Sequence, residues 1–124
     1  MREVLIVATG GAFGAAARYL VSGWTYGWLG ERFPWGTLAV NLLGCFGLGV
    51  IMRGLETNAV SADARLLVGI GFLGAFTTFS TFGYETLRAD MGVAILNVMV
   101  SVVCGLGAVY VGLVTARAIW GRGA

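Results

Sequence analysis

The chain has 124 residues, of which 58% are hydrophobic and only 11% are charged, and its formal net charge is +2. A soluble domain usually carries about 25% charged residues, so this chain has too little polar surface to cover a globule in water. The composition therefore excludes an ordinary soluble enzyme and a disordered chain, and the small positive charge gives no reason to expect a nucleic-acid partner.

Charge-free runs of membrane length divide the chain. Three runs carry no charged residue, namely 33–52, 66–84 and 91–116, and the first apolar run, 4–24, carries only Arg18. A helix needs about 20 apolar residues to cross a hydrocarbon core of about 30 Å. Such runs are too long for barrel strands, so the sequence predicts an all-α membrane protein with one domain over residues 1–124. The four transmembrane helices are expected at about 4–26, 34–54, 64–89 and 92–117.

The first predicted helix contains close-packing glycines and one charge. A signal peptide is an alternative interpretation of this run, but the apolar stretch continues past the small residues at 15–17, which favours a retained helix. Gly10 and Gly14 lie one turn apart, a spacing that lets membrane helices approach closely. Arg18 continues the same face. Because an intramembrane charge is costly, Arg18 either extends to the membrane surface or faces a water-filled cavity and draws anions.

The second predicted helix has one polar residue at membrane depth, Asn41. A hydrogen bond between helices is the usual explanation for a buried asparagine, and a ligand contact is the sharper alternative. The same helix carries Cys45, and the fourth helix carries Cys104. These cysteines lie in apolar runs without a metal-binding spacing, so both are expected to be small core residues.

The third predicted helix is the most unusual. Its Gly69-x-Gly71-x-x-Gly74 pattern matches a dinucleotide fingerprint, but it lies inside a membrane span without the required strand. Four hydroxyl residues follow near the centre of the span: Thr77, Thr78, Ser80 and Thr81. Gly74 and the two β-branched threonines should weaken the helix there, which predicts either a simple bend or a break that lines a binding site.

The fourth predicted helix repeats the small-residue spacing at Cys104, Ala108, Gly112 and Ala116. Helices packed this closely cannot enclose a wide pore, so any transport path is expected at helix or subunit boundaries of an oligomer. The arginines favour the side that holds both termini by only two or three residues. This is a weak preference for termini inside the cell.

Three motifs follow one another along the first three predicted helices. They are Gly10-Gly11-x-x-Gly14-Ala15-x-x-Arg18-Tyr19, Gly36-Thr37-Leu38-x-Val40-Asn41-x-x-Gly44, and Gly71-Phe72-x-Gly74-x-x-Thr77-Thr78-Phe79-Ser80-Thr81-Phe82-x-x-Glu85. Together they resemble the bacterial fluoride ion channel family, Fluc or CrcB. The resemblance covers the whole chain in order. Two positions depart from the family pattern: Ala75 replaces a frequent glycine, and Ser101 stands where some relatives carry an aromatic residue or histidine. The contribution of the fourth helix is therefore left open.

The resemblance implies a non-enzymatic, fluoride-selective channel in the bacterial inner membrane, which lets F⁻ leave the cytoplasm passively and relieves fluoride toxicity. It implies an antiparallel, dual-topology homodimer with pores at the subunit interface and a third helix broken near the midplane. It also implies a structural Na⁺ at the dimer centre, held by the backbone carbonyls of Gly74 and Thr77.

The resemblance also assigns pore residues. They are Asn41, the two phenylalanines Phe79 and Phe82, and the hydroxyls of Ser80 and Thr81, with Arg18 near the vestibule. Amide and hydroxyl groups donate hydrogen bonds, and an aromatic ring has a positive edge, so these groups suit a small anion without fixing an opposite charge. A stripe of core phenylalanines is the alternative interpretation of the rings.

Two other functions compete with the channel. A small multidrug-type, proton-coupled transporter also has four helices, but it needs a carboxylate at membrane depth, and Glu85 lies near a helix end. Glu85 is instead a possible partner of Arg18 or a marker of the end of the span. The third candidate is a membrane assembly subunit that transports nothing.

Overall fold

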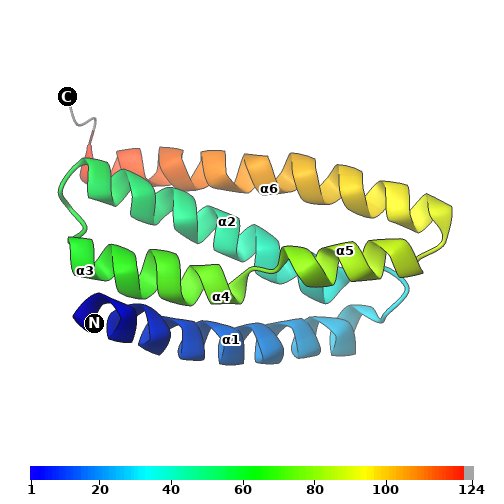
Figure 1. The fold of residues 1–124 in the computed structure, drawn as a ribbon. Coiled ribbons are helices and arrows are strands. Elements are labelled where there is room, and N and C mark those ends of the chain that lie inside the picture. Colours follow the sequence, from blue (N-terminus) through cyan, green and yellow to red (C-terminus); the bar gives the residue numbers. More distant parts are fainter. Residues whose placement is uncertain (122–124) are drawn as a thin grey trace.

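The structure is a computed structural model, and it describes residues 1–121, so residues 122–124 of the predicted single domain lie outside the described part. Four long helical segments lie side by side and alternate in direction (Figure 1). They are α1 (Arg2–Leu29), α2 (Trp35–Glu56), the composite segment Ala62–Arg88, and α6 (Met91–Trp120). The composite segment consists of α3 (Ala62–Ala64), the π-helix η1 (Arg65–Leu73), α4 (Gly74–Phe76) and α5 (Phe79–Arg88).

All four segments are long and apolar enough to cross a membrane, and the described residues contain no strand. The predicted all-α membrane fold is therefore confirmed. Both α1 and α6 extend past their predicted bounds of 4–26 and 92–117, since their polar ends can continue as helix beyond the hydrocarbon. Both described chain ends and the turn between α2 and α3 lie at one end of the bundle, and the other two turns lie at the opposite end (Figure 1).

Glycine sets the spacing between the helices. A Cβ atom added to Gly10 or Gly14 of α1 would collide with the backbone of η1, at Leu67 and Phe72 respectively. From the other side, a Cβ on Gly71 would lie 2.6 Å from the Val7 carbonyl oxygen. These contacts confirm that the glycines of the first helix permit close approach.

The second close contact joins α2 to α6. Gly49 and Gly112 face each other's helix backbone, and Ala116 is fully buried. The small-residue spacing predicted for close packing of the fourth helix is thus confirmed at Gly112 and Ala116 of α6. The prediction that both cysteines are core residues is wrong for Cys104, which is exposed on α6, whereas Cys45 is half-buried. An apolar thiol can face lipid as readily as a core, so hydrophobicity alone could not separate the two.

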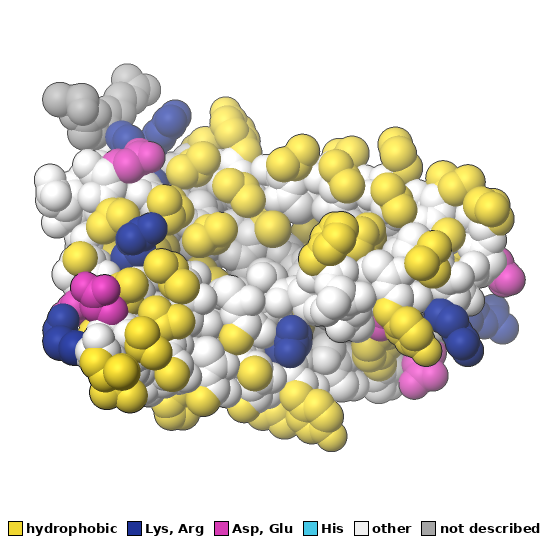
Figure 2. All heavy atoms as spheres, viewed as in Figure 1, with side chains coloured by type: hydrophobic (Ala, Val, Ile, Leu, Met, Phe, Trp, Pro, Cys, Tyr) yellow, Lys and Arg dark blue, Asp and Glu magenta, His cyan; other side chains and the backbone are white. Residues whose placement is uncertain are grey.

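The outer faces of the bundle are apolar. Most charged side chains lie toward the two ends, and hydrophobic side chains cover much of the length between them (Figure 2). Trp28 and Leu87 are about nine-tenths exposed, as is expected of side chains that contact lipid. The chain is a multi-pass membrane protein.

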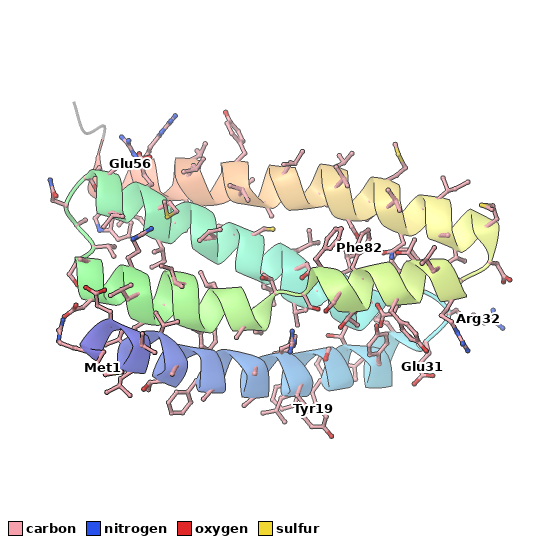
Figure 3. The ribbon with its side chains drawn as sticks, in the orientation of Figure 1. Met1, Tyr19, Glu31, Arg32, Glu56 and Phe82 are labelled. Atoms are coloured by element: carbon pink, nitrogen blue, oxygen red, sulfur yellow. The ribbon has the colours of Figure 1, made fainter. Side chains whose placement is uncertain are left out.

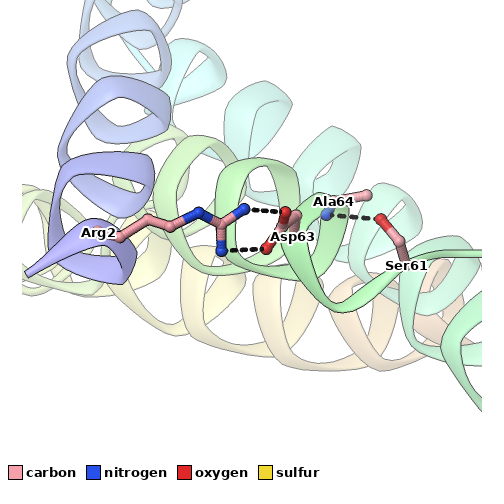
Figure 4. A network of polar contacts seen from close by, with 4 residues as sticks. All are labelled: Arg2, Ser61, Asp63 and Ala64. Atoms are coloured by element: carbon pink, nitrogen blue, oxygen red, sulfur yellow. Dashed lines mark hydrogen bonds and ion pairs between the residues drawn. The ribbon is translucent and has the colours of Figure 1, made fainter.

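An ion pair joins two helix starts at one end of the bundle. Arg2 donates to both carboxylate oxygens of Asp63, and the Ser61 hydroxyl accepts a hydrogen bond of 3.1 Å from the N–H of Ala64, which caps α3 (Figure 4). Both partners of the ion pair are exposed. The pair aligns α1 with the start of the third segment, and its exposure means that it contributes little to stability.

Candidate functional site

The third segment is interrupted at two threonines. Thr77 (φ −81°, ψ 157°) and Thr78 (φ −150°, ψ 117°) have extended backbone, between the end of α4 at Phe76 and the start of α5 at Phe79. Gly74 itself is helical, with φ −62° and ψ −35°. The interruption therefore lies at the β-branched pair, as expected, whereas Gly74, which was expected to weaken the helix with them, stays helical. β-Branched residues favour the extended region.

Asn41 of α2 pairs with the extended backbone of Thr78. Its Oδ1 accepts from the Thr78 N–H at 2.7 Å, and its Nδ2 donates to the Thr78 carbonyl at 3.1 Å. The amide thus replaces the backbone partners that an interrupted helix loses. Such a replacement is needed in a membrane, because buried N–H and C=O groups must be hydrogen-bonded within the protein. Because an amide carries two N–H groups, one N–H of Asn41 is not used in these bonds.

Thr78 also begins α5. Its hydroxyl oxygen accepts from the Thr81 N–H at 3.2 Å, the usual N-cap contact, and its own hydroxyl donates to the Thr81 Oγ1 at 3.1 Å. Thr78 is 8% exposed, so these bonds lie in a buried environment.

These contacts free two carbonyl groups. In an α-helix each N–H bonds to the carbonyl four residues earlier, so the N–H groups of Thr78 and Thr81 would bond to Gly74 and Thr77. Here those N–H groups bond to Asn41 and to the Thr78 hydroxyl instead. The carbonyl oxygens of Gly74 and Thr77 therefore lack their helical donors.

A cavity of about 330 Å³ opens beside the interruption, between the third segment, α2 and α6. We call it the break cavity. The residues that line it include Asn41, Gly74, Thr77, Phe79, Phe82 and Ser101. No Asp or Glu lines it. Residues of α2, the third segment and α6 thus meet in one space.

The two phenylalanines lie three positions apart on α5, with ring centroids 5.5 Å apart and planes inclined by 43°. Phe82 is half-buried and points from α5 toward α6 (Figure 3). Phe79 is 82% exposed, and a Cβ added to Gly74 would meet no atom within 4 Å. The break cavity is therefore open on its outer side.

A second cavity of about 240 Å³ lies among α1, α2 and α5. We call it the arginine cavity, because Arg18 lines it together with Tyr26, Thr81 and Glu85. The Tyr26 hydroxyl donates to the Glu85 Oε1 at 2.6 Å, and the Glu85 Oε2 is buried without a partner among the described residues. Glu85 thus shares a cavity with Arg18, but its bonded partner is Tyr26.

The structure divides the predicted site residues between these spaces. Asn41, Gly74, Thr77, Phe79 and Phe82 line the break cavity, and Arg18 and Thr81 line the arginine cavity. Arg18 also approaches the break, with its Nη1 3.5 Å from the Thr77 carbonyl oxygen. Ser80 lines neither cavity, and its exposed side chain lies with Oγ 3.3 Å from the Thr78 Oγ1.

Two polar residues near the site were not predicted from the sequence: Tyr26, which bonds Glu85, and Asn97 of α6, which is 1% exposed. Thr78 was expected to weaken the helix, but its pairing with Asn41 was not predicted. Asn97 carried the same signal as Asn41, a lone amide inside a charge-free run. Tyr26 carried no such signal, because a tyrosine near a helix end is common at membrane interfaces.

Comparison with known proteins gives one consistent result. The model of the family described as "CrcB-like protein, Camphor Resistance (CrcB)" matches residues 5–113. A protein of Geobacter sulfurreducens named "Fluoride-specific ion channel FluC" is 47% identical over 122 residues, which cover 94% of this chain and 98% of the relative. A protein of Acidobacterium capsulatum with the same name is 48% identical over 122 residues, with the same coverage.

Proposed function

The chain belongs to the CrcB family, and we propose on this basis that it is a fluoride-selective ion channel of the bacterial inner membrane. It lets F⁻ leave the cytoplasm down its electrochemical gradient and so relieves fluoride toxicity. The observation that carries the proposal is the 47% identity, over nearly the full length of both chains, to a protein named as a fluoride-specific channel. The family consists of ion channels, so the chain is not an enzyme.

Neutral donors around the interruption support passage of a small, strongly hydrated anion. Asn41 keeps one N–H beyond its bond to the Thr78 carbonyl. The Thr81 hydroxyl accepts from Thr78, which leaves its own proton free to donate into the arginine cavity. Such groups replace water around F⁻ without binding it as tightly as a fixed cation would.

The aromatic rings supply a different contact. Phe79 and Phe82 line the break cavity, and the positive edge of each ring can face an anion. In this role Asn41, Phe79, Phe82 and Thr81 line the pore, and Ser80 joins it from the exposed face of α5, where a second chain would cover it. Arg18 raises the local anion concentration at the vestibule.

The open side of the break cavity supports a homodimer. Phe79 is a large apolar side chain with 82% exposure beside a cavity that contains polar groups. A second copy packed there completes the cavity wall, and the family resemblance makes this dimer antiparallel, with two pores. Dual topology agrees with an arginine distribution that differs only slightly between the two sides.

The freed carbonyls fit a structural Na⁺ at the dimer centre. Gly74 and Thr77 would hold it through backbone oxygens, two from each chain, and such hard donors suit a hard cation. The lining of the break cavity includes no carboxylate that would call for a divalent ion. The contact of Arg18 with the Thr77 oxygen is long, 3.5 Å, and a carbonyl has a second lone pair for the cation. When bound, the cation would attract the carbonyl oxygens of both chains and so hold the two chains together.

The experiment uses purified protein in liposomes loaded with KF and KCl, with F⁻ release followed by a fluoride electrode. With the K⁺ ionophore valinomycin present, so that K⁺ leaves and balances the charge of the departing F⁻, we expect F⁻ efflux in the absence of proton or Na⁺ gradients, while Cl⁻ stays inside. Efflux that requires a proton gradient would support the small multidrug-type exchanger instead. Absence of any flux from a folded dimer would favour a non-transporting assembly subunit.

A further inference from the structure

Asn97 lies in the middle of a chain of hydrogen bonds that reaches the break cavity. Its Nδ2 donates to the Thr86 Oγ1 at 2.8 Å, and its Oδ1 accepts from the Ser101 hydroxyl at 3.2 Å. Thr86 in turn donates to the carbonyl of Phe82 at 2.6 Å. The bonds therefore run in one direction, from Ser101 through Asn97 and Thr86 to the backbone of Phe82.

This chain of hydrogen bonds is one of two side-chain connections that hold α5 against neighbouring long helices among the described residues, the other being the Tyr26–Glu85 bond to α1. The half-helix α5 has no buried residue, and its backbone is separated from α4 by the interruption. Among the described residues, the bond between Asn97 and Thr86 is the one side-chain hydrogen bond that joins α5 to α6. Since Asn97 is 1% exposed, water cannot replace a lost partner there. Together with the Tyr26–Glu85 bond to α1, this bond restricts the rotation of α5 against α6.

Two lining residues of the break cavity depend on this contact. Phe82 lies one helical turn before Thr86, so the rotation of α5 sets where its ring stands in the cavity. Ser101 lines the same cavity, but its proton is directed to Asn97. Its oxygen therefore presents lone pairs to the cavity, and the hydroxyl cannot donate to an anion without breaking that bond.

We propose that Asn97 is a positioning residue of the anion pathway, which holds the Phe82 ring in place through Thr86 and keeps the Ser101 proton away from the pore. The inference rests on the proposed function, because it assigns a task at the same pore. It adds that the fourth helix acts by orienting groups and not by donating to F⁻ itself.

The first test removes one hydroxyl. Thr86→Val is nearly isosteric but cannot bond Asn97, and Thr86→Ser keeps the bond. The matched control is Thr25→Val, since among residues 1–121 the Thr25 hydroxyl bonds only the Val21 carbonyl of its own helix. For equal amounts of purified protein, we expect Thr86→Val to lower F⁻ efflux roughly 3- to 15-fold, the range for losing such a bond in a membrane, and Thr86→Ser to restore it. Equal efflux from Thr86→Val and Thr25→Val would overturn the proposal.

The second test concerns Ser101 and uses a double-mutant cycle with Asn97→Leu. If Ser101 acts only through Asn97, Ser101→Ala causes no additional loss of F⁻ efflux in the Asn97→Leu background. Losses that multiply would mean that Ser101 contacts the anion independently, and this would overturn the second half of the proposal.

A third measurement separates this inference from the channel function. A single ¹⁹F label on the Phe82 ring, introduced as 4-fluorophenylalanine, reports the ring's surroundings whether or not the protein conducts. We expect Thr86→Val to shift or broaden the ¹⁹F resonance and Thr86→Ser and Thr25→Val to leave it unchanged. A ¹⁹F resonance that is unchanged in Thr86→Val would refute the positioning role. Wild-type protein without F⁻ flux would refute the channel function alone.

Discussion

Asn41 shows how one amide can both hold a backbone and face an anion. Its oxygen and one N–H are bonded to Thr78, and the second N–H is not used in those bonds. The sequence marked Asn41 as unusual because it is alone at membrane depth. It could not identify the partner, because Thr78 lies 37 positions away and the pairing depends on how two helices pack.

Changes at Asn41 should affect both tasks. Asn41→Asp keeps an acceptor for the Thr78 N–H but places a carboxylate oxygen against the Thr78 carbonyl, where Nδ2 now donates. We expect F⁻ efflux from liposomes to fall about 5- to 100-fold, the range for a lost buried hydrogen bond with an unpaired group. Asn41→Ser keeps a donor and should impair efflux less. Equal efflux from Asn41→Asp and wild type would remove Asn41 from the anion path.

The phenylalanines give a second prediction at the scale of residues. Phe79→Ile and Phe82→Ile keep apolar volume but remove the positive ring edge. We expect both variants to fold and dimerise and to lose most F⁻ efflux. Phe79 is 82% exposed within one chain, so its replacement should leave the stability of that chain almost unchanged. Efflux retained in both variants would show that the rings are packing residues.

At the scale of elements, the third segment combines a predictable and an unpredictable part. The density of Thr and Ser near the centre of the span indicated weak helix, and the interruption lies there, at Thr77 and Thr78. Gly74 was expected to weaken the helix, because glycine lowers helix propensity on average, but its backbone is helical. Tertiary contacts decide at each position whether the backbone stays helical. The Asn41 amide stabilises an extended Thr78, and no local pattern contains that contact.

The contact between α1 and η1 gives a prediction for one element pair. Gly14→Ala places a methyl group against the Phe72 carbonyl, so the two backbones must separate. We expect a lower thermal unfolding midpoint in detergent and a loss of about 1–3 kcal/mol of stability, the usual cost of overpacking. The matched control is Gly27→Ala on the same helix, where the added Cβ meets nothing within 4 Å. Equal midpoints for the two variants would mean that α1 and η1 do not pack this closely in the protein.

At the scale of the whole molecule, the sequence predicted the membrane fold well, because the length of a charge-free run directly measures whether a helix can cross the hydrocarbon. The roles of the site residues stay predictions. The structure places Asn41 and Phe82 at one cavity and Ser80 outside both cavities, and Asn97 was not singled out from the sequence. Rotation about a helix axis decides which residues face a cavity, and in lipid both faces are apolar, so hydrophobic periodicity gives little information about rotation.

The last prediction concerns the assembly of two chains. Within one chain Gly74 faces open space, so Gly74→Leu should leave the fold of the single chain intact. In the proposed dimer the same position lies at the centre, and a leucine there would crowd the two Gly74 and Thr77 carbonyl pairs. We therefore expect Gly74→Leu to yield monomers on size-exclusion chromatography and no F⁻ efflux, whereas Thr77→Ser keeps the backbone oxygen and should be nearly silent.

The same arrangement predicts how Na⁺ should act. A cation enclosed by backbone oxygens of both chains is a fixed part of the dimer, so replacing Na⁺ with a large organic cation should reduce F⁻ current slowly, at the rate at which the bound ion leaves. The F⁻ current of wild-type protein is measured in planar bilayers, and the Gly74→Leu variant serves as the non-conducting control. The reversal potential should follow the F⁻ gradient alone. A reversal potential that follows the Na⁺ gradient would make Na⁺ a transported substrate, because a static ion cannot couple its own gradient to the movement of F⁻.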